Sequence, residues 1–113
     1  MHELGITQNI VTIAAEYANG NPVKRVTLEI GQLSAVMPDA IRFCFDVCSQ
    51  GTPLAGASLE IIETPGLGRC RRCSREIALD VPFGVCECGC QDLQIIQGEE
   101  LLIKQLEMED VCV

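Results

Sequence analysis

Cysteine is the residue type whose spacing predicts chemistry in this chain. The sequence holds eight cysteines in 113 residues, and five of them fall in two short motifs, C-R-R-C and C-E-C-G-C. Two cysteine turns at this separation are typical of a zinc ribbon, in which each turn offers two thiolates to one side of a tetrahedron. The sequence therefore predicts a tetrathiolate Zn(II) site built from Cys70, Cys73, Cys86 and either Cys88 or Cys90.

The fourth ligand of this site stays open between two cysteines. Gly89 follows Cys88, and a glycine after the second sulfur permits the tight turn whose amides face that sulfur. Against this choice, the C-x-C bite from Cys86 to Cys88 is short for two corners of one tetrahedron. Cys90 is the alternative, at the longer C-x-x-x-C spacing from Cys86.

The residues around the cysteines favour a metal over a disulfide cluster. Nothing else in the chain is typical of a secreted protein, where disulfides normally form. Half of the eight Lys and Arg residues flank the first cysteine pair, and positive charge there would offset the charge that four thiolates leave around a dication. These basic residues are Arg69, Arg71, Arg72 and Arg75. Their charge could also serve only to keep the surface of a small subdomain solvated.

Composition and charge narrow the class of protein. A net charge of −8 and a pI of about 4.5 argue against nucleic-acid binding, because phosphate contacts need a basic face. The first residues, Met-His-Glu-Leu-Gly-Ile, contain no basic region, and no run approaches the roughly twenty apolar residues of a membrane span. We therefore expect a soluble, cytoplasmic protein with no nucleic-acid or membrane partner.

Hydrophobic periodicity predicts two helices and a few strands. Over residues 6–18, apolar side chains recur at helical spacing, at Ile6, Ile10, Ile13, Ala14 and Tyr17. A second helix over 38–49 would place three side chains on one face, Ile41, Phe45 and Cys48. Strands are predicted from alternation and β-branched content over residues 23–31, 58–64, 93–96 and 101–108.

These elements predict an α+β fold, with a small mixed three-stranded sheet, two helices on one face and an inserted zinc-ribbon-like module. Residues 66–98 would form the zinc-binding module, because about thirty residues cannot hold a hydrophobic core without a metal. Residues 1–65 and 99–113 would form the αβ domain that carries the N-terminus. On its second helix, Cys44 and Cys48 lie one turn apart, and their apolar neighbours favour buried structural thiols over a metal pair.

The N-terminus is the second place where residue types predict chemistry. His2 is the only histidine of the chain. With the Met1 amine and an amide nitrogen, its imidazole can close two fused chelate rings, which suits square-planar Ni(II) or Cu(II). Glu3 adds a carboxylate nearby, although it could equally be a favourable charge at a helix N-terminus.

The sequence resembles a known family over essentially its whole length. The resemblance rests on the Met-His-Glu start and its helix, residues 24–31, the segment 43–46, the paired cysteines and residues 98–101. Together these features resemble the HypA/HybF nickel metallochaperones of NiFe-hydrogenase maturation. The resemblance implies a cytoplasmic accessory protein that passes Ni(II) to the hydrogenase large subunit with a HypB-type GTPase, and in some bacteria also serves urease and its maturation proteins.

The resemblance also implies roles for individual residues. His2 would be the indispensable nickel ligand, assisted by the Met1 amine and by Glu3, with Asp39 as an additional nickel-side group. The plain alternative for Asp39 is an acidic residue in the first turn of a helix.

The zinc motif departs from the family, whose second pair is usually C-x-x-C. Counting back from Leu93 places the fourth cysteine at Cys88, whereas counting forward from Cys73 favours Cys86 and Cys90.

Three classes of function compete for this chain. The leading class is a nickel chaperone that is not an enzyme. The alternative is a zinc-ribbon protein-interaction module without a nickel role, in which His2 would be dispensable. A zinc hydrolase is disfavoured, because four sulfurs leave no open position on the metal for water.

Overall fold

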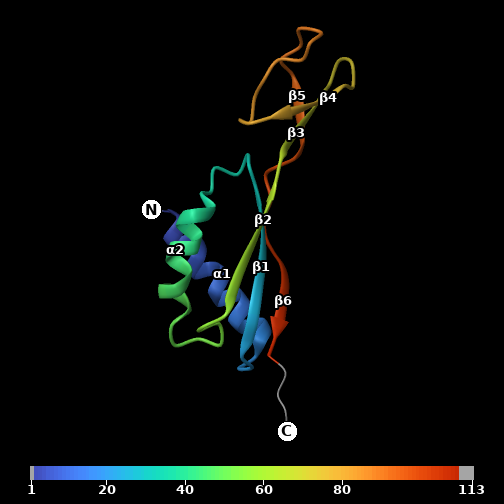
Figure 1. Ribbon diagram of the computed structural model, residues 1–113. Coiled ribbons are helices and arrows are strands. Elements are labelled where there is room, and N and C mark those ends of the chain that lie inside the picture. The colour runs from blue at the N-terminus through green and yellow to red at the C-terminus, as the bar shows by residue number, and fades with distance from the viewer. Residues whose placement is uncertain (1, 110–113) are drawn as a thin grey trace. The chain divides into compact units, whose positions relative to one another are not determined.

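The computed structural model describes residues 2–109, so Met1 and residues 110–113 lie outside the described part of the chain. Two three-stranded sheets form, with strand orders β2-β1-β6 and β4-β3-β5 (Figure 1). The elements, in chain order, are α1 (His2–Ala18), β1 (Val23–Gly31), α2 (Pro38–Ser49), β2 (Ser58–Thr64), β3 (Gly66–Cys70), β4 (Glu76–Leu79), β5 (Leu93–Gln97) and β6 (Leu101–Met108). None of the described helices is long and apolar enough to cross a membrane.

The described residues divide into two compact units. The helical unit contains residues 2–28, 37–62 and 102–109. The cysteine unit contains residues 29–36 and 63–101, and thus includes the whole of the predicted module 66–98.

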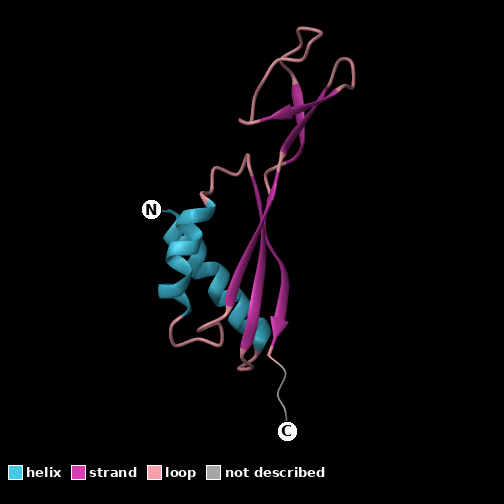
Figure 2. Ribbon diagram, in the orientation of Figure 1, coloured by secondary structure: helices cyan, strands magenta, loops and turns pink. Residues whose placement is uncertain are grey.

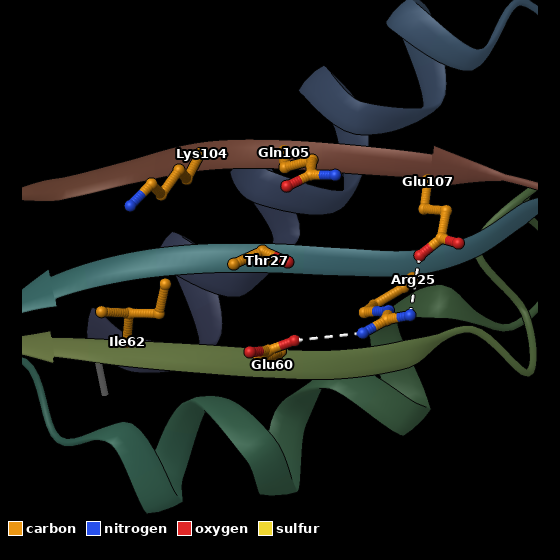
Figure 3. A pocket seen from close by; sticks show the side chains of 7 residues that line it. All are labelled: Arg25, Thr27, Glu60, Ile62, Lys104, Gln105 and Glu107. Atoms are coloured by element: carbon orange, nitrogen blue, oxygen red, sulfur yellow. Dashed lines mark hydrogen bonds and ion pairs between the residues drawn. The ribbon is translucent and has the colours of Figure 1, made fainter.

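In the helical unit, both helices lie on the same side of the β2-β1-β6 sheet (Figure 2). Strands β1 and β2 run in one direction and β6 in the other (Figure 3), so the sheet is mixed. The predicted α+β fold with its inserted ribbon-like module is confirmed. The core of the unit is formed by apolar side chains of the helices and the central strand, among them Ile10, Val11, Ala14, Val26, Leu28, Ile41 and Phe45.

The opposite face of this sheet carries mostly polar side chains, with Ile62 of β2 as an apolar exception. Arg25, Thr27, Lys104, Gln105 and Glu107 line a shallow pocket of about 360 Å³ together with residues of β2 (Figure 3). Since strands alternate their side chains between faces, the two sides of β1 differ as the sequence pattern predicts.

The cysteine unit is built around β3, which pairs antiparallel with β4 and with β5. Backbone segments of this unit approach one another so closely at Gly31, Gly66 and Gly98 that side chains would not fit there. A Cβ on Gly31 would clash with the backbone of Gly98, and one on Gly98 would lie 2.6 Å from the Cα of Gly66. Gly98 also has a φ of +112°, a backbone conformation that glycine adopts without penalty.

Candidate metal centre

Four cysteine sulfurs converge in the cysteine unit. The Sγ atoms of Cys70, Cys73, Cys86 and Cys88 all lie within 4.8 Å of one another. The Cys70–Cys88 sulfurs are 3.6 Å apart and the Cys73–Cys86 sulfurs 3.5 Å. Four sulfurs at about 2.3 Å from a tetrahedral zinc ion are separated by about 3.8 Å, so these two sulfur pairs lie near the spacing that such an ion requires.

The first cysteine turn is shaped to stabilise thiolate. Cys70 ends β3, and its Sγ accepts backbone N–H groups from Arg72 and Cys73, each at 3.4 Å. The hydrogen bond from Cys73 is the main cause that lowers the pKa of Cys70 to about 6, with Arg72 adding to it against the opposing effect of burial. A thiol with this pKa is already ionised at neutral pH and ready to bind a metal.

The second cysteine turn is closed by its own backbone. Gly89 N–H donates to the Cys86 carbonyl at 2.8 Å, and Cys86 N–H donates to the Cys90 carbonyl at 2.9 Å. Gly89 adopts a φ of +92°, which explains why a glycine follows Cys88. A hydrogen bond from the Cys88 backbone lowers the pKa of Cys86, but burial and the neighbouring thiols outweigh it. They raise that pKa to about 12 in the metal-free protein.

Cys90 lies outside the four-sulfur cluster. Its Sγ accepts the backbone N–H of Asp92 at 3.4 Å, and its side chain is half-buried. Within the cluster, Cys70 and Cys86 are buried, whereas Cys73 and Cys88 are exposed. The structure thus brings together three of the predicted ligands with one of the two candidates for the fourth position.

The arginines near the cluster are mostly paired with carboxylates. Three ion pairs form between them and nearby acidic side chains, Arg69–Glu76 at 2.8 Å, Arg71–Asp92 at 3.1 Å and Arg75–Glu87 at 2.9 Å. Charges paired in this way give the thiolates less compensation than the sequence alone indicated. The backbone N–H groups that donate to Cys70 act on the sulfur directly.

The nickel candidates lie at the start of α1, in the helical unit. His2 is the first described residue of the helix, and its side chain is 63% exposed. Its Nε2 lies 3.4 Å from a carboxylate oxygen of Glu3. Met1, predicted to supply its amine, lies outside the described residues. Because the first N–H groups of a helix have no intrahelical acceptor, the amide nitrogens at His2 and Glu3 are not committed to the helix.

One residue that shapes this terminus, Thr7, is missing from the sequence-based predictions. The buried Thr7 donates its hydroxyl to the carbonyl oxygen of Glu3 at 2.7 Å and so fixes the first turn. A threonine four residues after the acceptor makes this bond in many helices, which is the signal that could have identified it.

Asp39 does not join His2 and Glu3 in the structure. Its carboxylate is 99% exposed in the first turn of α2 and lies 3.8 Å from Arg42. Among residues 2–109, the cysteine cluster is the one group of three or more His, Cys, Asp or Glu side chains close enough to hold an ion.

The fold and the site together define the class of protein, a small α+β protein with a cluster of four cysteines. A family model described as "Hydrogenase/urease nickel incorporation, metallochaperone, hypA" matches residues 1–108, and the chain belongs to this HypA family. It is 67% identical to "Hydrogenase maturation factor HypA" of Trichormus variabilis over 113 residues, covering 100% of both chains. The protein of the same name from Nostoc punctiforme is 66% identical over 113 residues, again with 100% of both covered.

Solved structures agree with this assignment. The solution structure of the Ni metallochaperone HypA from Helicobacter pylori matches with a TM-score of 0.67 and 26% identity, covering 94% of this chain and 96% of that one. A second structure, described as the solution structure of HypA protein, gives a TM-score of 0.68 at 29% identity and covers 96% and 97%.

Proposed function

We propose that the chain is a nickel metallochaperone that binds Ni(II) at its N-terminus and delivers it during NiFe-hydrogenase maturation in the cytoplasm. Membership of a nickel-incorporation family and relatives named as hydrogenase maturation factors support this role. Its partners would be a HypB-type GTPase and the hydrogenase large subunit, with urease maturation proteins as further candidates.

The proposed nickel ligands are the Met1 amine, an amide nitrogen and the His2 imidazole. The observation that carries this proposal is the place of His2, the only histidine of the chain, at the exposed start of α1. Amide nitrogens without helical acceptors can be deprotonated by a metal, and together with imidazole they favour a planar Ni(II) site. Glu3 lies beside the imidazole and would orient it or compensate the charge of the ion.

Asp39 has a weaker place in the proposal. It would have to leave Arg42 before its carboxylate could approach an ion held at His2. An Asp39→Asn variant tests this directly, because it keeps the shape of the side chain and removes the charge.

Zinc has a separate, structural role in the proposal. The donor set of Cys70, Cys73, Cys86 and Cys88 would hold Zn(II) and tie together the two turns that carry the cysteines. Since four thiolates fill the coordination sphere, no position would remain for a reacting water, and the protein would act as a carrier and not as an enzyme.

The deciding experiment is a Ni(II) titration of zinc-loaded protein. Wild type is compared with His2→Ala and with a variant extended by a metal-free segment ahead of Met1. We expect one Ni(II) with a planar, low-spin spectrum in wild type, its loss in both variants, and unchanged zinc content and fold. Equal nickel binding by the extended variant would exclude the terminal amine. Full hydrogenase maturation by His2→Ala would favour the alternative, a zinc-ribbon interaction module.

A further inference from the structure

The second cysteine turn offers the metal two different sulfurs. Zinc sites commonly use a C-x₂₋₄-C spacing, and the step from Cys86 to Cys90 falls within that range. The step from Cys86 to Cys88 is shorter than the range, yet Cys88 is the residue whose sulfur lies in the cluster. The position between these two thiols, where a C-x-x-C turn would carry its second ligand, is occupied by Gly89.

The backbone holds both candidate thiols in the same turn. Hydrogen bonds from Gly89 to Cys86 and from Cys86 to Cys90 close the turn, so that both candidate thiols belong to one small loop. A Cβ on Gly89 would meet no atom within 4 Å, and the glycine has a φ of +92°, so the loop has room to rearrange there. The sulfur of Cys90 has one polar partner residue among the described residues, Asp92, whose backbone N–H lies 3.4 Å and whose carbonyl oxygen lies 3.8 Å from it.

We propose that Cys90 is a reserve fourth ligand that exchanges with Cys88 on a zinc ion held by Cys70, Cys73 and Cys86. The inference rests on the zinc site of the proposed function and adds a second bound form to it. Cys88 is exposed, and exposed thiolates are the ones most readily lost to oxidation or alkylation. With Cys90 in the same loop, loss of Cys88 would leave the ion four-coordinate and the module folded.

The test uses the full chain and two readouts, zinc content and Co(II) substitution. Co(II) absorbs through sulfur-to-metal charge transfer, so its spectrum counts the thiolates bound. The variants are Cys88→Ser, Cys90→Ser and the double variant, with Cys44→Ser as control because Cys44 is a half-buried cysteine of the helical unit. We expect one zinc and a four-thiolate Co(II) spectrum in both single variants and in the control.

The double variant should behave differently from either single variant. We expect a three-thiolate Co(II) spectrum and a zinc affinity lower by more than about 100-fold, since even partners outside the ligand shell are worth 10–100-fold. A Cys88→Ser variant with three thiolates, or with zinc affinity as low as the double variant, would overturn the exchange. Loss of zinc from Cys90→Ser alone, or four thiolates in the double variant, would overturn it as well.

The same experiment separates this inference from the proposed zinc site. A wild-type protein that binds no zinc contradicts the site itself. If the wild type binds zinc and the Cys88→Ser variant does not, the proposed zinc site stands. That result contradicts only the exchange between Cys88 and Cys90.

Discussion

The helical unit and the cysteine unit bury different kinds of side chain. The helical unit buries a continuous set of aliphatic and aromatic side chains, including Val26, Leu28, Ile41, Phe45 and Leu54. In the cysteine unit the buried apolar residues are Ile30, Leu33 and Leu79, together with two of the clustered cysteines, Cys70 and Cys86. The first unit is thus stabilised by burial of apolar surface, whereas the second has a smaller apolar core and would depend on the zinc ion proposed for its sulfurs.

The largest expected effect is the loss of zinc from the cysteine unit. Structural zinc in small modules contributes on the order of 10 kcal/mol, which is more than the apolar core of this unit can replace. We expect Cys70→Ala, or a strong chelator, to unfold residues 63–101 while the helical unit stays folded. Two-dimensional NMR of backbone amides reads both units at once.

A matched control for this prediction is Cys44→Ala, which removes a thiol from the helical unit and should leave zinc content unchanged. Dispersed amide signals from the cysteine unit after complete removal of zinc would contradict the contrast between the units.

The second effect targets the apolar core of the helical unit. Phe45 is 2% exposed in α2, and Phe45→Ala should lower the free energy of unfolding by about 3–5 kcal/mol through lost burial and the cavity left behind. Phe43 lies two positions away and is 81% exposed, so Phe43→Ala should change stability by less than about 0.5 kcal/mol. Urea denaturation followed by circular dichroism measures both.

Zinc should remain bound in each of these variants at zero denaturant, because neither side chain belongs to the cysteine unit. Similar losses of stability from Phe45→Ala and Phe43→Ala would show that burial of apolar side chains does not determine the stability of the helical unit.

The sequence predicted the fold class correctly, but it did not predict which faces of the helices are buried. Alternation and the breaks around the helices identified both helices and four of the strands, but β3 and β4 of the cysteine unit were missed. The buried face of α1 was also not predicted, and it is formed by Thr7, Ile10, Val11, Ala14 and Ala18. Ile13 and Tyr17, which fit the helical period, are exposed, Tyr17 at 80%. Apolar residues surround much of this helix, so periodicity alone does not tell which side meets the sheet.

On α2 the prediction of the buried face was wrong at one position, for the same reason. Ile41 and Phe45 are buried as predicted, but Ser49 is buried where Cys48 was expected, and Cys44 and Cys48 are half-buried. The Ser49 hydroxyl donates to the carbonyl of Asp46, so its polar group is satisfied within the helix.

At the metal centre, the sequence predicted that cysteines are the candidate ligands. It did not predict which of Cys88 and Cys90 joins the cluster, nor which ion pairs form around it. The cysteine spacing identified the cluster, but whether Cys88 or Cys90 joins it depends on the path of the loop. Arg69 and Glu76 face each other because β3 and β4 pair in that register, which the sequence does not state.

A smaller effect concerns protons released when zinc binds. Thiols bind zinc as thiolates, so acid weakens binding. The pKa of Cys70 is lowered to about 6, so its thiolate is present above pH 6 and is lost as pH falls through that value. Cys86, with its pKa raised to about 12, must release a proton at any pH used.

We therefore expect zinc binding to release about 0.7 of a proton more at pH 5.5 than at pH 7.5, with apparent affinity falling more steeply below pH 6, by up to about one extra factor of ten per pH unit. Calorimetric titration in buffers of different ionisation enthalpy counts these protons. Equal proton release at both pH values would contradict a Cys70 thiolate stabilised by the Arg72 and Cys73 amides.

The smallest expected effect lies on the polar face of the sheet in the helical unit. Arg25 forms ion pairs with Glu60 at 3.4 Å and with Glu107 at 2.8 Å, and all three side chains are partly exposed (Figure 3). Because exposed ion pairs contribute about 0–1 kcal/mol, Arg25→Met should cost no more than that, and the cost should shrink in high salt. Lys104→Met is the matched control, since Lys104 lies on the same face with no ion pair among the described residues. Urea midpoints at low and high salt measure both variants, and a salt-independent loss above about 2 kcal/mol in Arg25→Met would mean that this unit depends on its charges as well as on its apolar core.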